Sequence, residues 1–167
     1  YDNGEIDTLL YAQDKFKSSP LIIKSDFNEN WILIASKDHN LYSLDFSGNV
    51  RFVYSTLYEV ASSPSIVDIN SNTIGIFFGG QDGHLYGINQ NGENLPGWPI
   101  PIGGQFTTSP SISDLDNDGD PEIICGNSSG DLYAFNLDGT LVNYFPIEYS
   151  SSISTSPSII DLDNDGD

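Results

Sequence analysis

A nine-residue stretch near the end of the sequence, DLDNDGDPE at 114–122, alternates carboxylates around a glycine. In a tight loop, side chains at positions 1, 3 and 5 can turn toward one point, and Gly119 permits the sharp turn. The main-chain carbonyl of the residue after this glycine and the carboxylate at position 9 can close an oxygen shell. The expected metal ligands are Asp114, Asp116, Asp118, Asp120 and Glu122.

Hard oxygen donors and four converging carboxylates favour Ca²⁺ over zinc or copper, while Mg²⁺ prefers to keep its waters and a strict octahedron. Without a cation, the like charges would repel one another strongly. The loop is not an EF-hand, because its twelfth position is Cys125 and a strand-like segment follows. The alternative interpretation is a solvated acidic turn that holds no metal.

The same loop begins again as DLDNDGD at 161–167. The sequence ends before its position 9, so we expect a weak or empty site in this chain and a true site in a longer parent chain. The expected ligands of this second loop are Asp161, Asp163, Asp165 and Asp167.

Two earlier counterparts of the loop have lost most of these ligands. One has Asp68, Asn70 and Asn72 at positions 1, 3 and 5 and no closing acid; the other has Lys24 at position 1, before Asp26 and Asn28. Neutral amides and a missing acid argue against calcium in both. Our hypothesis is that the Lys24 ammonium offsets Asp26 in place of a metal.

Composition limits the partners of the chain. Its 24 acidic residues against 5 basic ones give a formal charge of −19, which repels nucleic acid and anionic membranes and suits a divalent cation. No apolar run approaches about 18 residues, so we expect no membrane insertion. The only cysteine, Cys125, is expected to be a small buried residue without an internal disulfide.

We expect no catalytic residues. His39 and His84 are interpreted as exposed turn residues, because neither belongs to a metal-spaced cluster or a recognisable triad. Aromatic residues at a constant phase are more often packing residues than a ligand platform. Tyr42, Tyr86 and Tyr133 are such residues, and Trp98 is expected to fill the space between neighbouring repeats.

Internal repeats organise the chain. Ser-Pro recurs at 19–20, 63–64, 109–110 and 156–157, and a Leu-Tyr marker ending in glycine follows the first three pairs. This pattern predicts one repeat-built segment, 1–167, whose ends both fall within a repeat, so we expect a fragment of a longer chain. The units are a repeat tail at 1–4, repeats at about 5–48, 49–92 and 93–139, and a partial repeat at 140–167.

Four strand-like segments rich in Ile, Val, Tyr and Phe occur in the repeat that begins near Thr108, separated by Ser-Gly and Asp-Gly turns. Four antiparallel strands in about 45 residues is the size of a β-propeller blade. We predict an all-β fold of such blades, about three and a half repeats that form a partial propeller; a β-solenoid is the structural alternative. The expected strands of this repeat are 109–115, 122–127, 131–136 and 141–147.

The stretch SPSISDLDNDGDPEIICGNSSGDLYAFNLDG at 109–139, together with LPGWPIP at 95–101, resembles FG-GAP/VCBS-type propeller repeats. These repeats occur in secreted and surface bacterial proteins, and a related form occurs in the propellers of integrin α-chains. The resemblance covers nearly the whole chain. It implies blades, calcium in some of them, and an extracellular or cell-surface location, but no single activity.

These observations favour a noncatalytic, calcium-stabilised propeller that acts as a scaffold or binding module, as in adhesion, with a protein or a polysaccharide as its partner besides the neighbouring blades. The alternative is a segment of a secreted polysaccharide lyase or a quinoprotein-like enzyme. A lyase needs a basic residue in a sugar cleft, and the chain has five Lys and Arg in total. A quinoprotein needs a complete ring around its cofactor. Depolymerase activity on acidic polysaccharides would favour the enzyme.

Overall fold

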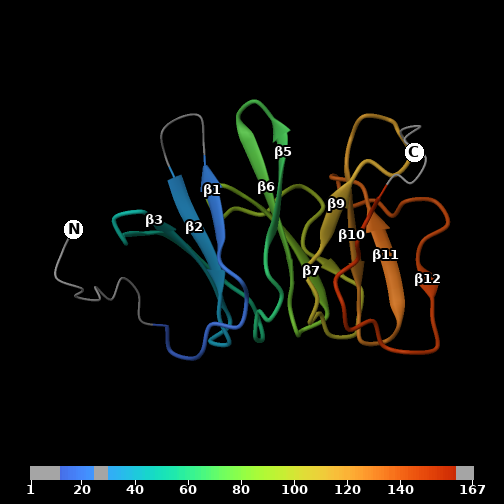
Figure 1. Ribbon diagram of the computed structural model, residues 1–167, viewed down its shortest axis with the longest axis horizontal. Helices are drawn as coiled ribbons and strands as arrows, with labels where there is room; N and C mark the ends of the chain where they lie inside the picture. Colours follow the sequence, from blue (N-terminus) through green and yellow to red (C-terminus); the bar gives the residue numbers. More distant parts are fainter. Residues whose placement is uncertain (1–11, 25–29, 161–167) are drawn as a thin grey trace.

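The computed structural model describes residues 12–24 and 30–160, which form twelve β-strands in three four-stranded antiparallel sheets (Figure 1). The first sheet consists of β1 (Leu21–Lys24), β2 (Asn30–Ala35), β3 (Asn40–Asp45) and β4 (Val50–Ser55). The second consists of β5 (Ser65–Asn70), β6 (Thr73–Gly79), β7 (His84–Asn89) and β8 (Ile100–Pro101). The third consists of β9 (Ser111–Ser113), β10 (Glu122–Gly126), β11 (Asp131–Phe135) and β12 (Ile147–Glu148).

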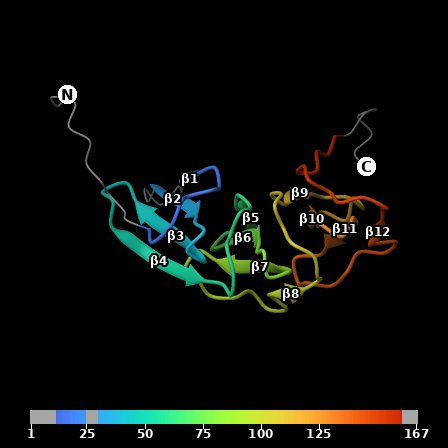
Figure 2. The same ribbon diagram turned by 90° about the horizontal axis from the view of Figure 1, so that it is seen from below.

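Consecutive strands are neighbours in every sheet, and the three sheets stand side by side in an arc (Figure 2). Within the described residues this arc does not close into a ring. The structure therefore confirms the all-β prediction of four-stranded blades in a partial propeller. None of the described residues form a helix with the length and apolar character that a membrane span requires.

Side chains that alternate along the strands build two cores between the sheets. In β2, Trp31, Leu33 and Ala35 are buried, and the residues between them are only half-buried. Successive side chains of a strand point to opposite faces, so one sheet can pack against a neighbour on each side. One core joins the first and second sheets, and the other joins the second and third.

The recurring Ser-Pro pairs join each blade to the next. The main-chain N–H of Ser19 donates to Ser63 Oγ at 2.9 Å, Ser63 donates in the same way to Ser109 at 3.0 Å, and Ser109 to Ser156 at 3.0 Å. Each sheet begins just after such a pair. The marker glycines used to count the repeats lie between the third and fourth strands of the sheets.

The outermost strands of the second and third sheets are short. The segment 141–147 is predicted as a strand, but only Ile147–Glu148 forms one, beside an isolated bridge between Leu141 and Phe135. This prediction is wrong because Pro146 has no N–H to donate and Tyr144 has a φ of 70°, which no strand residue adopts.

Two opposite edges of the molecule carry its loops (Figure 1). The β5–β6 turn and the acidic loop between β9 and β10 lie along the upper edge in this view, which we call the acidic-loop edge. The β2–β3, β6–β7 and β10–β11 turns lie along the lower edge with the connections between sheets, and we call this the turn edge.

Candidate metal site

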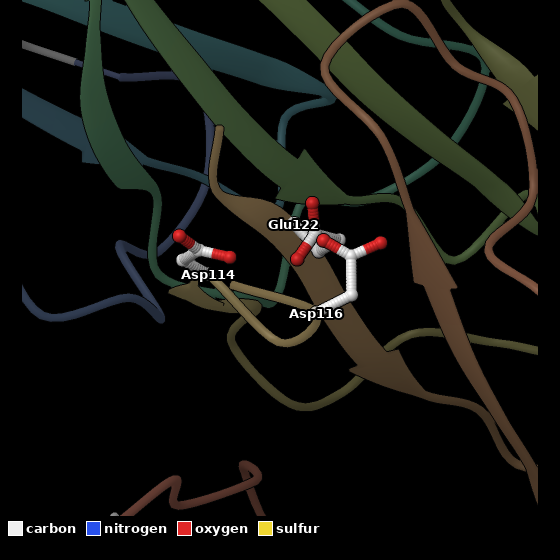
Figure 3. A group of neighbouring side chains, drawn as sticks. All are labelled: Asp114, Asp116 and Glu122. Atoms are coloured by element: carbon white, nitrogen blue, oxygen red, sulfur yellow. The ribbon is translucent and has the colours of Figure 1, made fainter. Parts of the chain in front are cut away.

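The acidic loop is held at its base by the first two strands of the third sheet. Glu122, the first residue of β10, is paired with Ser113, the last residue of β9, so residues 114–121 form the connection between them. Asp114, Asp116 and Glu122 each place a carboxylate oxygen within 4.8 Å of the others. Figure 3 shows the three side chains gathered beside β10. A hard cation can therefore be bound by oxygens from both the loop and the strand.

Main-chain N–H groups fix the shape of the loop. Gly119, with a φ of 96°, donates its N–H to Asp114 Oδ2 at 2.9 Å, and Leu115 donates to Glu122 Oε2 at 2.7 Å. These bonds leave Asp114 Oδ1 buried with no hydrogen-bond partner. A buried carboxylate oxygen without a partner is costly, so this atom fits a cation ligand.

Burial and like charge both act on Glu122, a residue that is 1% exposed. Burial raises the pKa of this carboxyl, the Leu115 N–H opposes the rise, and the charges of Asp116, Asp114 and Asp118 raise it further. No lysine or arginine follows Arg51 in the sequence, so no basic side chain of the third sheet offsets these charges. A bound divalent cation would offset them.

Three of the five expected ligands therefore lie together. Asp118 lies outside the three-carboxylate group, and its Oδ1 accepts the Asp120 N–H at 2.8 Å. The Asp120 carbonyl, expected as a main-chain ligand, also stays a prediction. The second loop, with Asp161, Asp163, Asp165 and Asp167, lies outside the described residues.

The counterpart loop of the second sheet closes in another way. Asp68 is paired with Ile74 within the β5–β6 hairpin, so its main chain belongs to a strand. Asn70 Oδ1 accepts the Asn72 N–H at 2.9 Å, an interaction that shapes a short turn without a metal. In the first sheet, Lys24 ends β1, but Asp26 and Asn28 lie outside the described residues, so the proposed Lys24–Asp26 compensation stays a hypothesis.

Several predictions about aromatic and other packing residues are confirmed. Trp98 packs with Phe77 and Phe135 and donates its indole N–H to the Leu137 carbonyl at 2.9 Å, which places it between the second and third sheets. Cys125 is buried in the same core. The marker tyrosines Tyr42, Tyr86 and Tyr133 pack within or against the sheets.

The two histidines differ from each other. His39 is an exposed turn residue, as predicted. His84 is half-buried at the start of β7, with Nδ1 3.5 Å from Asp82 Oδ1, so the interpretation of it as an exposed turn residue is wrong. Asp82 also accepts the hydroxyl of Tyr86 at 2.5 Å. The aspartate four residues before the marker tyrosine, present as Asp38 and Asp82, was a sequence signal for this contact.

Comparison with known proteins supports the same fold. Residues 114–167 match the sequence model of a family described as FG-GAP-like repeat. The chain is similar to BBS1N, solved in complex with ARL6DN, with 14% identity, a TM-score of 0.58, and coverage of 83% of this chain and 42% of that one. It is also similar to BamB from Moraxella catarrhalis, with 16% identity, a TM-score of 0.61, and coverage of 91% and 43%.

A computationally designed protein, Ika4, is similar over 96% of this chain and 89% of its own, with 14% identity and a TM-score of 0.64. The chain spans less than half the length of the BBS1N and BamB chains. No curated protein sequence matches it. These likenesses confirm the propeller fold, and the expected resemblance to FG-GAP-type repeats is confirmed where the family model matches.

Proposed function

We propose that this chain is a segment of a noncatalytic β-propeller that binds calcium in its acidic loop and serves as a scaffold or binding module of a secreted or cell-surface protein. The observation that carries the proposal is the cluster of Asp114, Asp116 and Glu122, with a fully buried glutamate and an unpartnered Asp114 oxygen. The match of residues 114–167 to an FG-GAP-like repeat supports an extracellular setting.

Calcium would act here as a structural brace. The three carboxylates come from two sides of one turn, and their mutual repulsion pushes the loop away from β10 when no cation is present. When bound, the ion supplies positive charge, which no lysine or arginine of the third sheet provides. The Leu115 N–H holds one oxygen of Glu122, which keeps this carboxylate oriented toward the loop. The turn between the inner strands of the blade is therefore fixed.

Thermal unfolding with and without calcium tests the metal site. A ligand that binds only the folded state at about 100 times its dissociation constant stabilises it by about 2.7 kcal/mol. For a chain of this size we therefore expect calcium to raise the melting temperature by roughly 5–10 °C over the chelator-treated protein. Magnesium at the same concentration should have a much smaller effect, because it demands a strict octahedron.

A matched pair of variants separates the site from general charge effects. Asp116→Asn removes one carboxylate of the cluster and should abolish most of the calcium-dependent shift. Asp68→Asn removes an acid from the corresponding position-1 site of the second sheet, where the turn closes without a metal, and should leave the shift unchanged. Equal calcium shifts in wild type and Asp116→Asn would contradict the proposal.

A further inference from the structure

The turn edge of the first blade differs from that of the other two at three equivalent positions. Corresponding main-chain hydrogen bonds identify the equivalent residues of the three blades. The N–H of Thr56 donates to the His39 carbonyl at 2.8 Å, the N–H of Ile102 to the Gly83 carbonyl at 3.0 Å, and the N–H of Tyr149 to the Gly130 carbonyl at 2.8 Å. The residues that follow are Leu57 and Tyr58 in the first blade, Gly103 and Gly104 in the second, and Ser150 and Ser151 in the third.

The first blade thus has three large side chains where the second has only glycines. Leu57 is 71% exposed, Tyr58 is 60% exposed, and the ring of exposed His39 lies 6.2 Å from that of Tyr58. The φ of His39 is 71°, a conformation that costs a non-glycine residue energy, whereas Gly83 and Gly130 adopt it freely. Strain that persists at an exposed site is a signal of function. We call these three residues the apolar anchor site.

The apolar anchor site is rigidly mounted. Thr56 Oγ1 donates to the Tyr58 carbonyl at 2.6 Å, and the Gln81 N–H donates to the Glu59 carbonyl at 3.0 Å. Lys37 Nζ lies 2.7 Å from Glu59 Oε2. These contacts tie the connection to both the first and the second blade. A preformed apolar surface loses little conformational entropy when a partner binds.

The polar groups around this site already have partners within the protein. Asp38 accepts the hydroxyl of Tyr42 at 2.6 Å, Asp82 accepts that of Tyr86, and Glu59 pairs with Lys37. A sugar needs polar groups to orient its hydroxyls, and Leu57 offers none. An aliphatic residue beside a tyrosine instead suits an apolar side chain of another protein.

Acidic residues on the turn edge indicate which residues flank the apolar side chain of the partner. In the third blade, Asp131 and Glu148 are register partners on neighbouring strands, and like charges directly opposite each other are destabilising. Asp131 accepts a bond from the neutral Asn127 side chain at 3.2 Å, and Glu148 is exposed. All five Lys and Arg residues of the chain lie at or before Arg51, so neither the second nor the third blade has a lysine or an arginine to pair with these two acids.

We propose that the turn edge binds a basic polypeptide segment whose apolar side chain sits on His39, Leu57 and Tyr58 and whose lysines or arginines extend toward Asp131 and Glu148. The net charge of −19 draws such a partner toward the molecule, and the apolar anchor site fixes its register. The proposal rests on the proposed role as a binding module and names the class of its partner. It does not depend on the calcium loop, which lies on the opposite edge.

Selection from a phage-displayed library of random peptides on the calcium-loaded full chain tests this surface. Enriched peptides should combine an aromatic or aliphatic residue with several Lys or Arg residues. Their affinity should fall about tenfold or more in the His39→Gly, Leu57→Gly, Tyr58→Gly triple variant, which reproduces the glycines of the second blade. It should fall about threefold or more in the Asp131→Asn, Glu148→Gln double variant, with a weaker dependence on salt.

Phe46→Ser is the matched control, because it removes an exposed residue (54%) that follows the end of β3 opposite His39, and it should leave peptide binding unchanged. Acidic peptides, equal binding to the triple variant, or no enrichment would overturn the proposal. The proposal would also be overturned if the protein bound arrayed glycans and no peptides, and if the triple variant lost this glycan binding. The calcium-dependent melting shift, measured on each variant, reports separately on the metal site and on folding.

Discussion

Glu122 is subject to two opposing demands, one from folding and one from the metal. Its carboxyl is buried beside Asp116 and Asp114, so its pKa is raised and the folded state without metal holds its proton more tightly than the unfolded chain does. The protonated group favours folding at low pH, and this contribution is lost as the pH rises from the ordinary glutamate range of about 4.3 through the raised pKa.

We therefore predict that Glu122→Gln stabilises the protein in chelator at neutral pH and destabilises it relative to wild type in saturating calcium. Glutamine keeps an oxygen for the Leu115 N–H but removes the charge that the cation needs. Urea unfolding at neutral pH with chelator and with calcium measures both effects, and a chelator series at decreasing pH should show the advantage of the variant shrinking. The same sign of change with and without calcium would refute the prediction.

A second residue-scale prediction concerns the backbone of His39. A left-handed φ costs an ordinary residue about 1–2 kcal/mol, and glycine gives back about 0.4–1 kcal/mol through its freer unfolded chain. His39→Gly should therefore raise the free energy of unfolding by up to about 1.5 kcal/mol, whereas His39→Ala keeps the unfavourable φ of 71° and should give no gain. Chemical denaturation compares the two variants, and an alanine variant as stable as the glycine one would show that strain is not the cause.

Contacts between individual residues could be predicted from the sequence only where the residues lie close together in the chain. The spacing of Asp114, Asp116 and Glu122 was enough to predict that they would lie together, because a nine-residue loop brings its own ends close. It did not reveal that the Leu115 N–H holds Glu122 or that Asp114 Oδ1 is buried without a partner, since both depend on how the loop lies against β10.

The same limit applies to the elements. Four antiparallel strands per repeat followed from turn residues and strand-forming runs, but the end of the third sheet was mispredicted, since Leu141 to Ile147 contains enough apolar residues for a strand. The positive φ of Tyr144 and the missing N–H of Pro146 decide against it. The second sheet has Gly97 and Pro99 at the same places, so alignment of the repeats was a usable signal.

Packing between elements yields a prediction about residue size. In the segment after each outermost strand (β4, β8 and β12), one apolar residue covers the space between blades. These covering residues are Val60, Phe106 and Ile153, and their N–H groups donate to the turns after β2, β6 and β10. The last residues of β2, β6 and β10 are Ala35, Gly79 and Gly126. A Cβ on Gly79 would lie 2.3 Å from Phe106 Cβ, and one on Gly126 would lie 2.4 Å from Ile153. The larger covering residues, Phe106 and Ile153, therefore face a glycine, whereas the smaller Val60 faces Ala35.

Gly79→Ala should accordingly destabilise the protein by about 1–3 kcal/mol through overpacking. Adding Phe106→Val recreates the Ala35–Val60 pair of the first blade, so the double variant should lose less stability than the sum of the two single variants. A double-mutant cycle by urea unfolding measures this coupling. Additive losses would mean that the two residues do not compensate each other, and the comparison of blades would then be wrong.

At the scale of the whole molecule, the two functions that we propose lie on opposite edges. The acidic-loop edge holds the candidate calcium ligands, and the turn edge carries the apolar anchor site and the Asp131–Glu148 pair. Among the residues described, Glu122 and the side chain of Asp82 are buried charged groups between these two edges. A metal that braces one edge can thus stabilise the blade whose other edge meets a partner.

The net charge itself leads to a last prediction. Every acid beyond Arg51 lies in a part of the sequence without a lysine or an arginine, so mutual repulsion opposes the compact state. Raising sodium chloride from about 0.1 M to 1 M shortens the screening length from about 10 Å to about 3 Å, which weakens that repulsion. Against this, salt can weaken the Lys37–Glu59 contact, but one ion pair at the surface contributes little to stability.

Repulsion among many charges should outweigh the loss of one pair, so salt should raise the urea midpoint of the chelator-treated protein. The rise should be smaller in saturating calcium, because the ion has already neutralised part of the acidic loop. Potassium chloride should act as sodium chloride does, since screening depends on ionic strength. A midpoint that falls with salt in chelator would show that specific ion pairs, and not the excess of negative charge, dominate the electrostatics of the fold.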